Sequence, residues 1–402
     1  MPNKEMWSEE MIAEQIKRTS VEQKSENVPE VSATDTIPDS NKRRNFLVVG
    51  CGDGGSMIAQ AIRDSIPGTY TICYNTSARA MEKLKADIKI VPQAEDGSGK
   101  VRDYSKDVFK QGSYKHLLGN VKAALEHHSD IAYILVTTTT DGGTGSGVSP
   151  MVARFIADNS EIPVIVIGVY PALTEDATAQ FNALNWQAEV EKIKLPYMIF
   201  DNGAVSGPKS MVHRMVNKEI ADVLKVITGD YYGNSDISMI DSRDMYMLLQ
   251  HTGKRIFIET DTDRPKTGQS LDDYVKNMIE DAYQPKPVNV KGIGVFVKGP
   301  ASMIGSLDTS LTEVRGIYGD AAIQYVHVQE SDDVQISVIM AGCSEPTDRL
   351  YTIRSRYDDI MNAQHDDESA LGDLMSGMNN PLGTMKKRTV DAAEPDLSAL
   401  DI

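Results

Sequence analysis

The chain has 402 residues, a formal net charge of −17 and 41% hydrophobic residues, so it is long enough for two domains with sizeable cores. It holds no run of about twenty apolar residues that could span a bilayer, which argues against a membrane partner. The negative net charge argues against direct nucleic-acid binding by the main body, because protein surfaces that bind nucleic acids are basic. Three widely spaced cysteines indicate reduced thiols in a cytoplasm, and no cysteine–histidine cluster has the spacing of a metal site.

A polar extension occupies residues 1–43, ahead of the first apolar run. Its start is charged and predicts no signal peptide. The first 40 residues carry nine acidic and four basic side chains. Proline, serine and threonine are frequent between Val28 and Ser40, a composition typical of disordered linkers, which cannot bury enough apolar surface to fold. We therefore expect the extension to be disordered in part and the ordered core to begin at residue 44.

Strand-like apolar runs alternate with helical segments over residues 44–209. The runs are Phe46–Gly50, Tyr70–Tyr74, Ile131–Val136, Val164–Val169 and Tyr197–Phe200. Unbroken apolar strands that alternate with helices are typical of a parallel sheet covered on both faces. This part of the chain is therefore predicted to be an α/β domain.

The pattern changes after a long helix predicted over residues 210–228, with Val212, Val216 and Leu224 on one side. Strands are expected at Arg255–Glu259, Val290–Lys298, Tyr325–Gln329 and Val334–Ala341, and helices near Ser270–Tyr283 and Ser310–Tyr318. This order predicts a smaller α+β domain over residues 229–345. A charged helix is expected over residues 346–368 and a flexible tail over residues 369–402.

The most informative motif is a turn rich in glycine and hydroxyl groups between the strand that ends at Val136 and a helical pattern that begins at Val148. Its residues are Gly142, Gly143, Thr144, Gly145, Ser146 and Gly147. A strand, a glycine turn and a helix N-terminus together form an anion site, because backbone N–H groups converge there and the helix dipole adds about half a positive charge. A flexible loop is the alternative for such a turn taken alone.

A second glycine-rich turn follows the first strand. It contains Gly52, Asp53, Gly54, Gly55 and Ser56. The G-x-G-x-x-G spacing from Gly50 favours a dinucleotide-binding oxidoreductase, but that fold expects an acidic residue at the tip of the second strand, where this chain has Asn75 and Thr76. No Walker loop is present. Two glycine turns at the carboxyl ends of parallel strands instead suit one nucleotide with several phosphates, held mainly by backbone amides.

The turn at 142–147 resembles the signature loop of the tubulin and FtsZ superfamily, and the order of elements fits from Asn45 to about Gln364. The segment Tyr170–Asp176, with Phe181–Leu184 behind it, is similar to the fifth nucleotide loop of the TubZ-like tubulins of bacterial plasmids and phages. The resemblance implies a tubulin/FtsZ-like α/β fold, in which a long central helix joins the nucleotide-binding domain to the α+β domain. It also implies GTP and GDP as ligands, with Mg²⁺ bridging the phosphates.

The resemblance places the turn at 52–56 on the first phosphate loop, where many relatives have Asn at the position of Ser56. Asn75 and Thr76 match the second loop. Gly99 and Lys100 stand in the third, which faces the terminal phosphate. Lys100 is expected there either as a point charge or as a solvated loop lysine.

The ribose and base contacts are carried over in the same way. Glu175 matches the carboxylate that accepts hydrogen bonds from the ribose hydroxyls. Asn182 is a second polar candidate on this loop, since Ala179 stands where many FtsZ proteins have an arginine. On the long helix, Asn217 matches the residue that reads the guanine edge. His213, four residues earlier, stands where relatives stack an aromatic ring; exposed polar residues are the alternative for both.

The segment Ile240–Met245 resembles the seventh loop of the family, where acids polarise the water that attacks the terminal phosphate. Asp241 and Asp244 are the catalytic candidates, and Met239 replaces the asparagine of the FtsZ pattern. In the family this loop completes the site of the next subunit, so hydrolysis should require assembly into a head-to-tail filament. The alternative is that Asp241 only caps the helix that follows.

The resemblance therefore implies a GTPase that forms filaments and positions or segregates plasmid or phage DNA in the cytoplasm of a bacterial host. Alternatives are a nucleotide-binding structural filament protein with weak hydrolysis and an FtsZ-like division protein. The expected partner is a second copy of the chain. The basic tail residues 386–388 are candidates for contact with an acidic surface or a DNA-bound adaptor, the acidic residues 391–402 for docking on a neighbouring subunit, and a solvated tail is the alternative.

Overall fold

The computed structural model describes residues 45–92, 97–228, 245, 248–249, 254–266, 269–308, 310–319 and 323–377. All of them belong to one compact unit, Asp39–Ile402. Predictions for residues 1–44, for 229–244 and for the tail beyond Gly377 lie outside the described residues. This applies to the catalytic candidates Asp241 and Asp244 and to the basic stretch 386–388.

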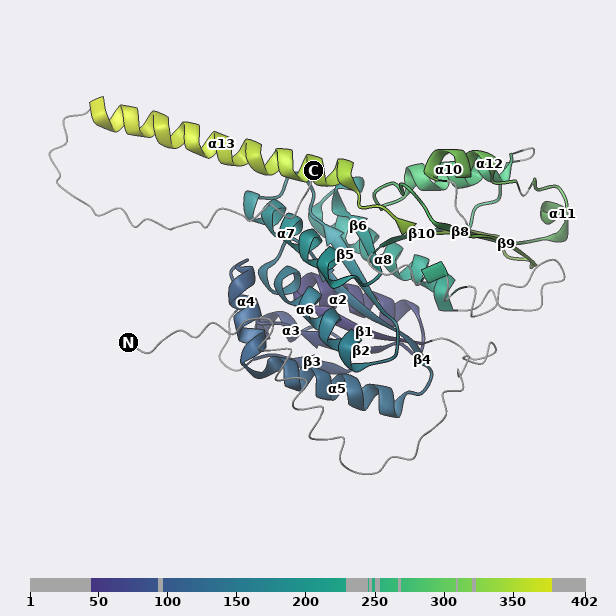
Figure 1. Cartoon of the computed structure of the whole chain (residues 1–402), viewed down its shortest axis with the longest axis horizontal. Helices are drawn as coiled ribbons and strands as arrows, with labels where there is room; N and C mark the ends of the chain where they lie inside the picture. Colours follow the sequence, from purple (N-terminus) through teal and green to yellow (C-terminus); the bar gives the residue numbers. More distant parts are fainter. Residues whose placement is uncertain are drawn as a thin grey trace. The chain divides into compact units, whose positions relative to one another are not determined.

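The described strands form a mixed sheet in the order β3-β2-β1-β4-β5-β6-β7-β10-β8-β9 (Figure 1). The first six are β1 (Asn45–Cys51), β2 (Tyr70–Tyr74), β3 (Ile88–Ile90), β4 (Ile131–Thr139), β5 (Val164–Tyr170) and β6 (Tyr197–Asp201). Neighbours among these six all pair in parallel. The predicted parallel sheet is therefore confirmed, with β3 as an addition that is too short to give a clear apolar run.

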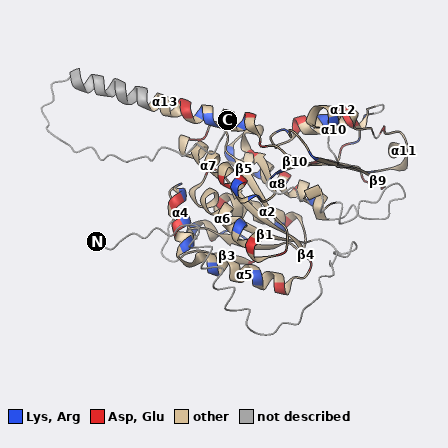
Figure 2. Ribbon diagram, viewed as in Figure 1, with Lys and Arg blue, Asp and Glu red and all other residues tan. Residues whose placement is uncertain are grey.

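Alternate side chains of the strands enter two cores, because successive residues of a strand point to opposite faces. Phe46 and Val48 of β1 join one core, while Leu47 and Val49 join the other. The first core is closed by α2 (Gly52–Ser65) and α8 (Lys209–Leu224). The second is closed by α5 (Tyr114–His127), α6 (Gly143–Asn159) and α7 (Ala177–Ile193). Charged side chains lie on helices and loops, and the strands between them are largely uncharged (Figure 2).

Shorter segments complete the first half of the structure. They are α3 (Ala78–Met81), α4 (Arg102–Val108), the π-helical turn Phe109–Ser113 and the 3-10 turns Asn202–Ala204 and Lys225–Thr228. The last of these directly follows α8, so the predicted central helix at 210–228 is present with a tightened final turn. A 3-10 turn is a common ending for an α-helix.

The described residues of the second half form four strands and three short helices with a core of their own. The strands are β7 (Arg255–Asp261), β8 (Gly292–Gly299), β9 (Ile323–Glu330) and β10 (Gln335–Cys343), and the helices are α10 (Leu271–Asp281), α11 (Ala301–Ile304) and α12 (Thr312–Tyr318). β10 is antiparallel to both β7 and β8, while β8 and β9 are parallel. Tyr197 of β6 pairs with Arg255 of β7, so the sheet continues from one half into the other.

The C-terminal helix α13 (Thr347–Gly377) is longer than the predicted segment 346–368. The apolar pattern thins out after Gln364, which is why the sequence suggested an earlier end. The residues that follow are mostly good helix formers, and the next proline is Pro381. Helix propensity therefore carries α13 beyond the part that packs on α7. Among the described residues, no helix is long and apolar enough to cross a membrane.

Glu345, just before α13, provides a test of how the start of α13 packs beside α7. Burial, reinforced by the neighbouring Glu191 carboxylate, raises its pKa to about 7. An unfolded glutamate has a pKa of about 4.3, so the folded state gains stability from protonation below pH 4 and loses it as the pH rises through 7. Glu345→Gln should therefore raise Tm by roughly 1–2 °C at pH 8.5 and leave it unchanged at pH 4.

Thermal unfolding followed by circular dichroism at the two pH values measures this difference. Glu161→Gln, which changes an exposed glutamate, is the matched control and should change Tm equally little at both. An equal gain for Glu345→Gln at both pH values would show that the ionised carboxylate costs no stability.

Candidate functional site

The candidate site lies at the sheet edge where β1, β2, β4 and β5 end. These strands are parallel neighbours or next neighbours, so the loops that follow them leave the sheet on the same side. The loops contain the two glycine turns, the Asn75–Thr76 pair and the Glu175 segment that the sequence singled out. The parallel topology thus brings together residues that are more than 100 positions apart in the chain.

The two glycine turns touch backbone to backbone. A Cβ atom on Gly52 would lie 2.8 Å from the nitrogen of Gly145, and a Cβ on Gly145 would lie 2.7 Å from the carbonyl oxygen of Cys51. Gly52 also has a φ of +72°, which residues with a side chain rarely adopt. No side chain fits at either position, so this close approach requires glycine in both turns.

Both helices that leave these turns start without a side-chain cap. The N-cap of α6 is Gly142, whose backbone is extended, and the first turn holds no acidic residue. The N-cap of α2 is Cys51, which makes no side-chain hydrogen bond to the helix either. The first N–H groups of a helix need acceptors from outside it, and the dipole favours a negative one. Two neighbouring uncapped N-termini are therefore well suited to an anion with several oxygens.

Hydroxyl and amide side chains connect the loops around these helix ends. Thr144 Oγ1 lies 2.7 Å from Thr76 Oγ1 and 3.2 Å from Ser98 Oγ, which links the signature turn to the second and third loops. Asn75 donates a hydrogen bond from Nδ2 to the exposed carboxylate of Asp53. The structure therefore assembles four of the loops that the sequence assigned to one site.

Lys100 is held in an ion pair. Its backbone has a φ of +66°, and its Nζ lies 2.5 Å from Oδ2 of Asp176. Asp176 also caps α7 by accepting a hydrogen bond from the Ala179 nitrogen at 2.8 Å. The hydrogen bond from Lys100 keeps the pKa of Asp176 below its usual range. An anion bound at the third loop would have to compete with Asp176 for this ammonium group.

Glu175 and the candidates on α8 are linked through Lys209. The Lys209 ammonium lies 2.5 Å from Oε1 of Glu175, which ties the loop after β5 to the start of α8. One turn further along α8, His213 and Asn217 are both half-buried and four residues apart. They therefore lie on the same side of α8, and α8 itself packs against α2, the helix of the first glycine turn.

Asn182 lies beneath the loops. It is 2% exposed, and its Nδ2 donates to the carbonyl oxygens of Lys100 and Asp141, each at 3.1 Å. Both amide hydrogens are thus used to join the third loop to the signature turn. Asn182 therefore positions the two loops, and its contact with the ligand stays a prediction.

Ser56 is a second motif residue with a buried side chain. Its backbone belongs to the first turn, and its side chain is 2% exposed. Its Oγ makes no hydrogen bond to another described residue. A contact of this hydroxyl with the ligand stays a prediction.

Arg102 is a supporting residue that the sequence did not reveal. It is 9% exposed and donates to the carbonyl oxygen of Ser146 at 3.1 Å and to Glu189 Oε2 at 2.8 Å. Burial lowers the pKa of its guanidinium, while Glu189 opposes that shift. The only sequence signal was its position two residues after Lys100, because the contact with Ser146 depends on how α4 packs on α6.

The C-terminal helix holds the loop after β5 from another side. Arg349 binds both carboxylate oxygens of Asp201 and donates from Nη2 to the Pro171 carbonyl oxygen at 2.8 Å. Arg356 donates to the carbonyl oxygen of Leu173 at 3.0 Å. The segment that carries Glu175 is therefore fixed by α13 as well as by Lys209.

No group of three acidic, histidine or cysteine side chains that could hold a metal ion is present among the described residues.

Comparison with known proteins finds a family that matches part of the chain. Residues 45–207 match the model of the Tubulin/FtsZ family GTPase domain. Cell division protein FtsZ 2 of Halobacterium salinarum is 24% identical over 325 residues, which cover 74% of this chain and 76% of that protein. Tubulin-like protein TubZ of Clostridium botulinum C phage is 24% identical over 278 residues, which cover 65% of this chain and 74% of that protein.

A solved structure shares the fold. The GTPγS-form protofilament of Bacillus thuringiensis serovar israelensis TubZ superposes with a TM-score of 0.67 at 17% identity, covering 83% of this chain and 96% of that chain. At this identity the likeness concerns the fold alone. It includes both halves of the sheet, so the similarity extends beyond the segment at 45–207.

The Asn182 bridge yields a testable prediction. Asn182→Ala removes both hydrogen bonds to the loop carbonyl oxygens, so amide exchange at residues 100–102 should become about tenfold faster. Hydrogen–deuterium exchange with mass spectrometry measures this rate. The control is Asn185→Ala on the same helix, because Asn185 bonds only within α7, to Phe181. Equal amide exchange rates at residues 100–102 in the two variants would show that the Asn182 hydrogen bonds do not hold these loops together.

Proposed function

We propose that this chain binds GTP at the edge formed by β1, β2, β4 and β5, because residues 45–207 match the model of the Tubulin/FtsZ family GTPase domain. The proposal further holds that subunits assemble head to tail into filaments and hydrolyse GTP between them. The observation that carries it is the contact of two uncapped helix N-termini at Gly52 and Gly145. That arrangement offers backbone donors to several phosphate oxygens at once.

The phosphates would bind the amides at the start of α2 and α6, with the Thr144 and Thr76 hydroxyls beside them. Gly99 and Lys100 would face the terminal phosphate, where the Lys100 ammonium could exchange Asp176 for a phosphate oxygen. Asp53 is a carboxylate, and direct contact with phosphate would be repulsive. It is better suited to the water shell of the Mg²⁺ ion that accompanies GTP, which neutralises charge on the phosphates.

The nucleoside would lie between the loop after β5 and α8. Glu175 would accept hydrogen bonds from the ribose hydroxyls and, in doing so, would exchange its contact with Lys209. Asn217 would offer a donor and an acceptor to the guanine edge, and His213 would contact the base one turn earlier. The half-buried position of both side chains beside the buried face of α8 supports this assignment.

Hydrolysis is proposed to use Asp241 or Asp244 of the neighbouring subunit. A carboxylate that orients water is a suitable group for phosphoryl transfer, which depends mainly on positioning and charge stabilisation. What supports the arrangement is the family of the GTPase domain and the protofilament formed by the TubZ relative of the same fold.

The proposed cellular role is positioning or segregation of plasmid or phage DNA in the cytoplasm of a prokaryotic host. The phage TubZ relative supports it. An FtsZ-like role in division is the second candidate, because the similarity to Cell division protein FtsZ 2 covers three quarters of both chains. A structural filament protein with weak hydrolysis stays open in view of Met239.

GTPase rate against protein concentration tests the shared active site. Specific activity should be near zero below a critical concentration and rise above it. Asp241→Ala or Asp244→Ala should lower turnover at least about a hundredfold, with filaments retained in one of them by electron microscopy. The control is Asp64→Ala, which changes an exposed residue on α2. Turnover independent of concentration would contradict hydrolysis between subunits.

Base recognition can be tested separately. Asn217→Ala should weaken GTP binding about tenfold and reduce the preference for GTP over ATP, because two hydrogen bonds to the base are lost. Competition against a fluorescent GTP analogue measures both quantities. Arg214→Ala, at an exposed position of the same helix, should bind like the original chain. An unchanged preference in Asn217→Ala would assign base recognition to other residues.

A further inference from the structure

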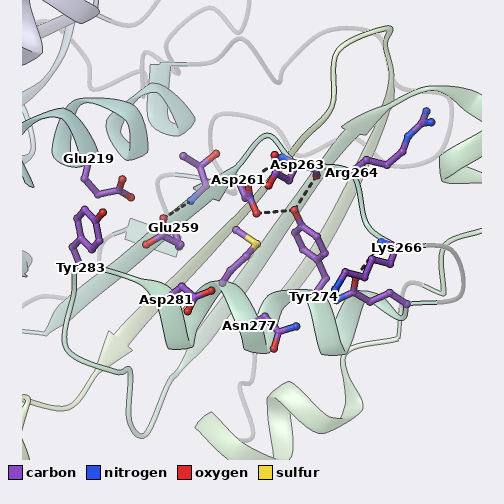
Figure 3. Close-up of a pocket in the computed structure, with 13 residues that line it drawn as sticks. Glu219, Glu259, Asp261, Asp263, Arg264, Lys266, Tyr274, Asn277, Asp281 and Tyr283 are labelled. Atoms are coloured by element: carbon purple, nitrogen blue, oxygen red, sulfur yellow. Dashed lines mark hydrogen bonds between the residues drawn. The ribbon is translucent and has the colours of Figure 1, made fainter. Parts of the chain in front are cut away.

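Apart from the candidate GTP site, a cavity of about 360 Å³ lies between the later part of α8, the end of β7 and α10 (Figure 3). Glu219 contributes from α8, Glu259 and Asp261 from β7, and Asp281 from α10. None of its lining residues belongs to the proposed GTP site. The cavity therefore needs an explanation of its own.

The lining has an excess of negative charge. Five carboxyl groups reach it, with Asp263 added to those four, against two basic side chains, Arg264 and Lys266. Both basic residues are exposed on the loop after β7, and Figure 3 shows the Arg264 side chain directed away from the carboxyl groups. The more deeply placed charged groups, Glu219, Glu259 and Asp261, are thus all acidic, while both bases are exposed.

Glu259 is the residue that points to a ligand. It is 7% exposed. Its Oε1 accepts a hydrogen bond from the Thr260 nitrogen at 3.1 Å, while Oε2 has no hydrogen-bond partner among the residues that the structure describes. Figure 3 shows Glu219 on the facing helix. A buried carboxylate oxygen without a donor is costly, so it implies a proton or a cation in that place.

A proton on Glu259 accounts for its unpartnered oxygen. Burial, together with Glu219 and Asp261, raises the pKa of Glu259 to about 10. Glu259 therefore holds a proton at neutral pH, as one of two close carboxyl groups commonly does. A cation that enters beside Glu259 would release this proton and restore its negative charge.

The rest of the wall is already ordered. Asp261 accepts a hydrogen bond from the Asp263 nitrogen at 3.0 Å and another from the Tyr274 hydroxyl at 2.7 Å. The ring of Tyr283 lies beside Glu219 in Figure 3. Aromatic faces next to carboxylates favour organic cations, which gain both charge pairing and cation–π contact. A ligand would meet a wall that needs little rearrangement.

The size and spacing of the acids exclude a simple metal site. No three of these carboxyl groups approach closely enough to hold a metal ion in the described part of the chain. A cavity of about 360 Å³ instead admits an aliphatic chain with several heavy atoms. We propose that it binds an organic polyamine, with one ammonium group between Glu219 and Glu259 and another toward Asp281.

Binding and proton release are coupled. At neutral pH the ammonium ligand enters with its protons and Glu259 gives its proton to the solvent, so charge and atoms balance. The groups that face Glu259 are Glu219, Asp261 and Asp281, with Tyr283 beside them. Because the lost proton belongs to a group with a pKa of about 10, affinity should rise with pH between 7 and 9.

Isothermal titration of the full chain with spermidine tests the proposal. We expect one saturable site and, from titrations in phosphate and in Tris at pH 7.5, release of close to one proton per ligand. Glu259→Gln should lower the affinity at least tenfold and abolish the proton release. The control is Glu280→Gln, which removes an acid of α10 that pairs with Lys286 outside the cavity, and it should bind like the original chain.

The half-buried Glu219 gives a second variant in case Glu259→Gln unfolds, which its thermal transition will show. Glu219→Gln should also lower both affinity and proton release. Three outcomes would each overturn the proposal. They are a titration without saturable heat, equal binding of spermidine by the Gln variants and the control, and full displacement of spermidine by equimolar Mg²⁺. The tests of GTP binding and hydrolysis use variants of other residues. Either outcome of the spermidine titration therefore leaves the proposed GTPase function unaffected.

Discussion

The parallel pairing of β1 with both β2 and β4 is the constraint on which the rest of the site depends. Parallel strands release their following loops at one edge of the sheet. At this edge the turns at Gly52 and Gly145 approach so closely that only glycine fits. Backbone hydrogen bonds of the sheet thereby fix the distance between two helix N-termini, and the positive ends of α2 and α6 act on the same volume.

The loop after β5 connects this edge to the rest of the molecule. Lys209 holds Glu175 from the central helix, and Arg349 holds the Pro171 carbonyl oxygen from α13. Arg349 also pairs with buried Asp201 at the end of β6, so breaking this contact would leave a buried carboxylate without its positively charged partner. A ligand that moved Glu175 would therefore act on α8 and α13 together, which is a physical route from the loop to the second half of the sheet.

The two proposed sites would bind ligands of opposite charge with different chemistry. The proposed anion site would use backbone amides and helix dipoles, which do not contribute to the net charge calculated from the sequence. The acidic cavity uses side-chain carboxyl groups around Glu259, where burial makes a proton or a cation necessary. The two sites flank one helix, since α8 carries His213 and Asn217 and, two residues after Asn217, Glu219.

The sequence by itself determined the α/β class, the strand order along the chain and the two glycine turns, because these depend on local periodicity and on backbone conformations that only glycine adopts. The tertiary structure decided which side chains meet. Asn182 and Ser56 occupy motif positions but are buried beneath the loops, and Arg102 supports the signature turn without any motif of its own. The Glu219–Glu259 pair likewise exists only because β7 packs beside α8. Such contacts join residues far apart in the chain, and spacing along a sequence carries no information about them until the sheet and its helices are packed.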